Sequence, residues 1–134
     1  MKSRSACGLT VLRVVIGIIF LVHGWQKLFG LGFHGVAGMF AHIGIPVPPV
    51  TSVIVTLVEF LGGIALILGL FTRWAAALIA CDMLGAIVFV HFKNGFSSAK
   101  GGYEFPLALL AAAIALALAG AGCWSADEML FKRS

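Results

Sequence analysis

The segment PVTSVIVTLVEFLGGIALILGL, residues 49–70, is almost entirely apolar and carries one carboxylate, Glu59, near its centre. About 20 apolar residues are enough to cross a bilayer, so this segment predicts a transmembrane helix with an acid near the midplane. A charge at that depth costs roughly 2.5 to 3.5 kcal/mol, so we expect Glu59 to have a partner, a proton or a polar cavity. Gly62, Gly63 and Gly69 follow on its face, and this smooth surface favours close approach of another helix or a flat ligand.

The composition indicates the class of protein. The chain has 134 residues, of which 61% are apolar and only 10% charged, which predicts a small integral membrane protein with a single domain over residues 1–134. The formal net charge is +4, but Lys and Arg are spread along the chain without forming a basic and aromatic surface, so we expect no nucleic acid partner. Cys7, Cys81 and Cys123 are far apart in the sequence with no C-x-x-C pair, so we expect no thiol-disulfide relay.

Hydrophobic runs separated by Gly-rich and Pro-rich breaks predict the other helices. We expect an all-α integral membrane four-helix bundle, with a short interfacial helix between its first two spans, inside residues 30–48. Pro49 suits the first turn of the second span, and Ser125-Ala126-Asp127-Glu128 is typical of a capping box. The predicted spans cover about 7–29, 49–70, 74–92 and 104–119, and a short amphipathic helix follows at about 125–132.

The loop charges predict the orientation. The positive-inside rule favours placing both termini on the cytoplasmic side, because that side then carries more Lys and Arg. We therefore expect a multi-pass protein of the bacterial inner membrane, in contact with membrane lipid and with both termini cytoplasmic. The cytoplasmic charges would be Lys2, Arg4, Arg73, Lys132 and Arg133, against Lys27, Lys93 and Lys100 on the other side.

Polar side chains on different spans predict a site. At about 100° per residue, Arg13, His23 and Lys27 share one face of the first helix. We expect an outward-opening pocket for the head of a quinone or a small anion, with His23 and Glu59 as catalytic proton carriers. Quinone reduction takes up two protons with its two electrons, which gives an acid and an imidazole a clear role. The residues expected to bind the quinone are Arg13, Gln26, Lys27, His91 and Glu104.

A structural interpretation of the same charges is also open. Arg13, Glu59 and Asp82 would then form a buried, self-neutralising network that fixes the helix register. Asp82 and His91 are nine positions apart, about 180° on an α-helix, so we expect only one of them to face the bundle axis. The other would face a second protomer or a lipid headgroup. In this interpretation Lys27 extends to the headgroups.

Metal and haem chemistry have weak support in the sequence. His23 and His91 are the smallest set of ligands that could hold a haem between two helices. With Glu104 they would be the smallest set that could hold a metal ion. Because the sequence offers no ligands beyond these smallest sets, we expect no metal and no haem. Cys81 is expected to be an inert small residue of the third span.

A set of motifs in a fixed order resembles the DoxX family of small bacterial membrane proteins, over nearly the whole chain. Each motif is weak alone, and together they are specific. They are Arg13, His23-Gly24-Trp25-Gln26-Lys27, Phe40-Ala41-His42-Ile43-Gly44-Ile45-Pro46, Glu59-Phe60-Leu61-Gly62-Gly63, Leu68-Gly69-Leu70-Phe71-Thr72-Arg73, Ala86, Glu104 and Gly120-Ala121-Gly122.

This resemblance implies a four-helix membrane bundle and a link to redox chemistry. Relatives include subunits of thiosulfate:quinone oxidoreductase, which work with a further redox subunit. We therefore expect a quinone-linked redox protein, with thiosulfate as one candidate donor. The alternative is a non-enzymatic membrane scaffold or accessory subunit of a redox complex. The small-residue faces also favour a homo-oligomer, unless the bundle itself uses them.

Overall fold

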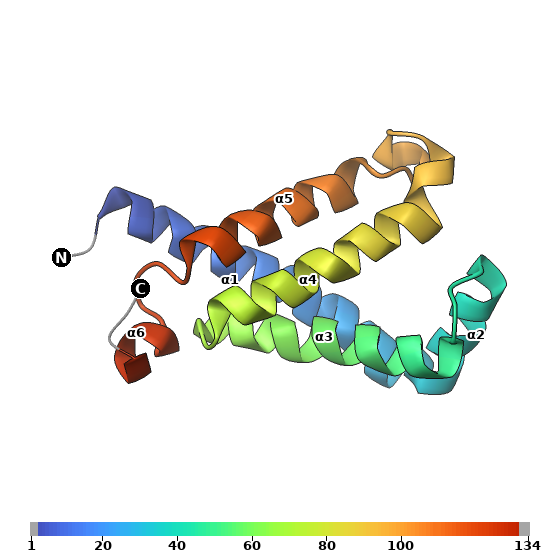
Figure 1. Ribbon diagram of the computed structural model, residues 1–134, viewed down its shortest axis with the longest axis horizontal. Coiled ribbons are helices and arrows are strands. Elements are labelled where there is room, and N and C mark those ends of the chain that lie inside the picture. The colour runs from blue at the N-terminus through green and yellow to red at the C-terminus, as the bar shows by residue number, and fades with distance from the viewer. Residues whose placement is uncertain (1–2, 132–134) are drawn as a thin grey trace.

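The computed structural model describes residues 3–131 and shows an all-α protein, with no β-strand in that part of the chain (Figure 1). Four longer helices make up most of it: α1 (Arg4–Trp25), α3 (Pro48–Leu68), α4 (Thr72–Ala86) and α5 (Glu104–Ala119). The π-helical segments η1 (Gln26–Leu31) and η2 (Ile87–His91) continue α1 and α4. The shorter elements are α2 (Gly32–Ile43), η3 (Phe92–Asn94), η4 (Ser98–Lys100) and α6 (Ala126–Phe131).

The helices form two groups. In one group α1 packs along α3, and α2 lies against the first half of α3; in the other α4 and α5 form a helical hairpin (Figure 1). α3 and α4 meet at the turn around Gly69 and diverge toward the end where α2 lies, so the two groups form a wedge. The start of α1 and α6 lie together at the opposite end (Figure 1). The predicted charges Lys2, Lys132 and Arg133, and the last residue of the predicted 125–132 helix, lie outside the described residues.

The long helices have the length and composition of membrane spans. The helical segments Arg4–Ile43, Pro48–Leu68 and Thr72–Asn94 contain windows with a mean hydropathy of 2.0 to 2.3, and only 22% to 28% of each window is buried inside the protein. Most apolar side chains therefore face outward, as they do toward lipid. α5 has 16 residues and is about 24 Å long at 1.5 Å per residue, somewhat shorter than a typical hydrocarbon core. The prediction of an all-α membrane bundle is confirmed.

Glycines allow α1 and α3 to pack backbone to backbone. A Cβ atom on Gly17 would lie 2.9 Å from the carbonyl oxygen of Gly63, and a Cβ atom on Gly63 would lie 2.5 Å from the backbone nitrogen of Leu21. A Cβ atom on Gly24 would overlap the backbone of Phe60. Part of the smooth face predicted on the second span is therefore used within the bundle.

The C-terminal helix α6 is fixed to the turn between α3 and α4. The Asp127 carboxylate accepts hydrogen bonds from the backbone N–H groups of Phe71, at 2.6 Å, and Thr72, at 2.9 Å. These N–H groups open α4, where a negative charge is stabilising. The Ser125 hydroxyl accepts from the N–H of Glu128 at 3.0 Å, which confirms the predicted cap of α6.

Candidate functional site

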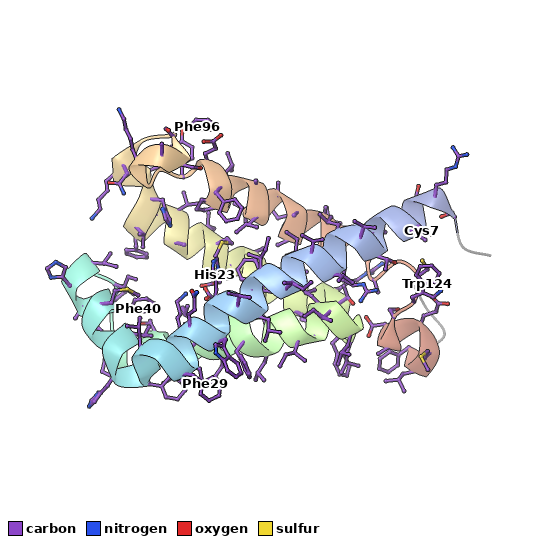
Figure 2. The ribbon with its side chains drawn as sticks, turned by 180° about the vertical axis from the view of Figure 1, so that it is seen from behind. Cys7, His23, Phe29, Phe40, Phe96 and Trp124 are labelled. Carbon is purple, nitrogen blue, oxygen red and sulfur yellow. The ribbon has the colours of Figure 1, made fainter. Side chains whose placement is uncertain are left out.

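A cavity of about 850 Å³ lies in the wedge between the two groups of helices. Most of its wall is apolar, and side chains from α2, η2 and α5 contribute much of it. Figure 2 shows His23 on α1 and Phe40 on α2, and both residues line this space. Its polar wall residues are His23, Lys27, Thr51, Glu59, Cys81, Asp82, His91 and Ser98.

An ion pair between Lys27 and Glu59 lies in the wall of the cavity. Lys27 Nζ lies 2.6 Å from Glu59 Oε1, and the side chains are 21% and 4% exposed. Glu59 lies in the middle of α3, and Lys27 reaches it from the π-helical segment η1, close to Gly24, where the backbones of α1 and α3 approach each other. The acid in the middle of the predicted span therefore has an ammonium partner, which offsets the cost of placing its charge inside a membrane.

A second carboxyl group lies beside this ion pair. Asp82 on α4 also lines the cavity near Glu59, and its Oδ2 atom is buried with no hydrogen-bond partner in residues 3–131. The cluster thus holds two carboxyl groups and one ammonium, so it is electrically neutral only when the carboxyl pair carries one proton. An arrangement of this kind can hold and release a proton.

Both histidines of the predicted pocket line the cavity. His23 is half-buried and packs edge-on against the ring of Phe20, with the ring centroids 6.0 Å apart. The Nδ1 atom of His91 lies 2.9 Å from the carbonyl oxygen of Gly101. Because a carbonyl oxygen only accepts, Nδ1 carries the proton in this hydrogen bond.

Asp82 and His91 line the same cavity, although an uninterrupted α-helix would place them on opposite faces. The expectation that only one of them faces the bundle interior is wrong. Residues 87–91 form a π-helix with i to i+5 hydrogen bonds, which turns less per residue than an α-helix and brings His91 back toward the cavity.

Gln26 and Glu104 were predicted to line the pocket and lie outside the cavity. The side chain of Gln26 is exposed at the start of η1. Glu104 is also exposed, and its Oε1 accepts a hydrogen bond of 3.1 Å from the backbone N–H of Ser98. This contact fixes the loop that ends the α4–α5 hairpin.

Arg13 lies outside the cavity and is 1% exposed. The structure does not bring it together with Glu59 and Asp82, the other members of the predicted charge network. All of its hydrogen bonds go to backbone carbonyl oxygens near the end of α3 and in the connection between α5 and α6. The bonds run from Nη1 to Leu66 and Ile67 at 2.9 Å, from Nε to Ala121 at 3.0 Å, and from Nη2 to Cys123 at 3.3 Å and Trp124 at 3.0 Å.

This arrangement gives Arg13 a structural position. The last carbonyl groups of a helix have no partner within the helix and carry a partial negative charge. A guanidinium supplies both the hydrogen-bond donors and the positive charge that stabilise these groups. Gly69 leaves the space for it: its φ angle is +70°, and a Cβ atom there would lie 2.7 Å from Arg13 Nη1.

Part of the wall comes from the segment that the sequence predicts to be an interfacial helix. Met39, Phe40 and Ile43 of α2 line the cavity. Phe40 recurs with Val36 at helical spacing and both are buried, and this periodicity was the available signal. Cys81, expected to be inert, also lines the cavity. Within residues 3–131 no group of three or more His, Cys, Asp or Glu side chains is arranged to hold a metal ion.

The fold and the cavity define a small multi-pass membrane protein with a polar cluster inside the membrane. The DoxX family model matches residues 8–92. The candidate oxidoreductase CatD of Bacillus subtilis is 37% identical over 132 residues, covering 98% of this chain and 93% of CatD. An uncharacterized membrane protein of Mycobacterium tuberculosis is 34% identical over 133 residues, covering 92% of this chain and 81% of the relative. The inner membrane protein YqjF of Escherichia coli is 31% identical over 135 residues, covering 99% of each chain.

The chain belongs to the DoxX family of membrane proteins, as the sequence motifs predicted. No solved structure matches it significantly.

Proposed function

We propose that the cavity binds a quinone and that the protein serves a quinone-linked redox reaction in the cytoplasmic membrane of a bacterium. The observation that supports this function best is the Lys27–Glu59 ion pair beside Asp82, whose Oδ2 atom has no hydrogen-bond partner among the described residues, in a cavity whose wall is otherwise mostly apolar. Ligand sites of this kind combine a large apolar wall with a few convergent polar groups. A quinone matches that pattern, because its ring and tail are apolar and its two carbonyl oxygens accept hydrogen bonds.

The cluster can supply what quinone chemistry needs from a protein. Reduction of one quinone to quinol consumes two electrons and two protons. In this proposal Lys27 and His23 donate hydrogen bonds to a quinone oxygen. Glu59 and His23 transfer protons to the quinone. The first of these protons is held by the Asp82–Glu59 pair. His91, with its Nδ1 proton engaged by Gly101, has Nε2 available as an acceptor.

The electrons come from outside this chain in the proposal. The resemblance to thiosulfate:quinone oxidoreductase subunits favours thiosulfate as the donor, with a further redox subunit as partner. Oxidation of two thiosulfate ions to one tetrathionate forms an S–S bond and releases two electrons. These two electrons, together with two protons, reduce one quinone to quinol. The name of CatD, a candidate oxidoreductase, supports redox chemistry in general.

The same proposal includes an orientation and an assembly. Both termini lie on the cytoplasmic side, and the chain forms a homo-oligomer. The exposed positions of Ala108, Ala111 and Ala115 on one side of α5 support oligomerisation, because small residues allow helices of two copies to approach closely.

A non-enzymatic accessory subunit is the alternative, and one observation favours it. The Lys27–Glu59 pair is closed at 2.6 Å, as expected for a structural charge network that needs no ligand. Under this alternative Glu59→Gln lowers stability or partner assembly and leaves the lipid content of the purified protein unchanged.

Mass spectrometry of organic extracts from protein in native lipid discs tests the proposal. We expect near-stoichiometric quinone with the wild type and at least a tenfold loss in Lys27→Ala and Glu59→Gln. Gln26→Ala is the matched control, because Gln26 is exposed and neighbours Lys27 in η1 without lining the cavity. Thermal unfolding of each variant separates loss of quinone from loss of fold. Equal background quinone in all four proteins would refute the proposal.

A further inference from the structure

Two cysteines that are distant in the sequence lie side by side in the structure. The Sγ atoms of Cys7 and Cys123 are 3.6 Å apart, although the residues are separated by 116 positions. Cys7 lies in the first turns of α1, and Cys123 lies in the connection between α5 and α6. Figure 2 shows Cys7 and Trp124, the residue that follows Cys123, at the same end of the bundle. This end is remote from α2 and from the part of the cavity that α2 lines.

Hydrogen bonds hold the connection against α1. The backbone N–H of Cys123 donates to Thr10 Oγ1 at 3.1 Å, and Thr10 Oγ1 donates to the Cys123 carbonyl oxygen at 2.6 Å. Arg13 Nη2 donates to the same carbonyl oxygen. Gly122 has a φ angle of +76° and lies so close to α1 that a Cβ atom would overlap the Ala6 carbonyl oxygen. The two thiols are therefore neighbours because the backbones that carry them are fixed together.

The distance is compatible with bond formation. A disulfide has an S–S length of about 2.05 Å, so the sulfurs must approach by roughly 1.5 Å, which rotation of the two side chains about their Cα–Cβ bonds can supply. The two thiols differ in access. Cys7 is half-buried, whereas Cys123 is only 2% exposed. An oxidant from solution reaches Cys7 first.

We propose that Cys7 and Cys123 form a site of reversible oxidation by hydroperoxides, with Cys7 as the attacking thiol and Cys123 as the resolving thiol. In the first step the Cys7 sulfur attacks a peroxide oxygen, the O–O bond breaks, and the products are a Cys7 sulfenic acid and an alcohol or water. In the second step the Cys123 sulfur attacks the Cys7 sulfur, the S–OH bond breaks and water leaves. The resulting disulfide joins the start of α1 to the α5–α6 connection.

The test uses full-length protein in lipid discs carrying Cys81→Ser, so that Cys7 and Cys123 are its only two thiols. Reduced protein takes up two maleimide groups after unfolding. After treatment with hydrogen peroxide we expect it to take up none, to lose two hydrogens in intact mass, to yield a peptide pair joined through Cys7 and Cys123, and to recover both maleimide groups after dithiothreitol.

Two single variants in the same background test the order of events. Cys123→Ser should trap the Cys7 sulfenic acid as a dimedone adduct, and Cys7→Ser should give no adduct. Thermal unfolding checks that each variant retains its fold. The proposal fails if the peroxide-treated pair still takes up two maleimide groups, if the disulfide joins two chains, or if Cys7→Ser forms the dimedone adduct and Cys123→Ser does not.

Discussion

Replacing Arg13 by lysine tests whether this residue is structural or belongs to the quinone site. Arg13 donates five hydrogen bonds to five carbonyl oxygens, one for each of its N–H groups. Lysine keeps the positive charge but has only three N–H donors, so at least two of these hydrogen bonds are lost. A hydrogen bond to a charged group contributes about 1.5 to 3 kcal/mol, so Arg13→Lys should lower the free energy of unfolding by about 3 to 6 kcal/mol.

Reversible unfolding in mixed micelles, followed by circular dichroism, measures this change. Arg4→Lys is the matched control, because Arg4 is exposed on the same helix and makes no hydrogen bond of this kind in the described structure. Quinone recovered from folded Arg13→Lys protein should equal that of the wild type, since Arg13 does not line the cavity. A variant of wild-type stability, or a stable variant that loses its quinone, would refute the structural assignment.

Gly24→Ala places a methyl group into the backbone of Phe60 and should destabilise the protein by about 1 to 3 kcal/mol in the same unfolding assay. Asp127→Ala removes the acceptor for the first N–H groups of α4 and should cost about 0.5 to 2 kcal/mol, with faster hydrogen exchange in the first turn of α4. Glu59→Gln leaves a partly buried ammonium without its counter-charge and should cost about 2 to 3 kcal/mol. Asp82→Asn replaces the second carboxyl group by a neutral amide and keeps the ion pair, so it should change stability by less than about 0.5 kcal/mol.

Matched variants control these measurements. Gly38→Ala adds the same methyl group to α2, at a position where no other described part of the chain lies within 4 Å, and should be neutral or slightly stabilising. Glu128→Gln removes a neighbouring charge of α6 that accepts neither N–H group and should leave α4 unchanged. Equal losses in the Gly24 and Gly38 variants would contradict close packing of α1 on α3. A larger loss for Asp82→Asn than for Glu59→Gln would contradict the charge assignment in the cavity.

The sequence was a good guide to the fold and to part of the site. Hydrophobic length and turn residues predicted the helices, and helical spacing predicted that His23 and Lys27 share a face. Because an unpaired charge inside a membrane is costly, the sequence predicted that Glu59 has a partner, and in the structure this partner is Lys27.

Other features leave no signal in a single sequence. The partners of Arg13 are backbone carbonyl groups, which every residue has, so no residue type marks them. A regular α-helix would place Asp82 and His91 on opposite faces. The π-helical segment that brings them to the same cavity has no distinctive composition, so the sequence does not reveal it. Cys7 and Cys123 meet only after the whole bundle has closed, so their spacing in the sequence says nothing about their distance in space.

The position of Arg13 also constrains how the protein is made. α1 is synthesised before α3 and before the α5–α6 connection, and it carries a guanidinium whose partners lie 53 to 111 residues later in the chain. At about 5 to 20 residues per second, the ribosome needs roughly 5 to 20 s to produce the last of them. Until then the guanidinium lacks part of the set of carbonyl groups that surrounds it in the folded protein. That set is complete only when the α5–α6 connection has been synthesised and lies against α1.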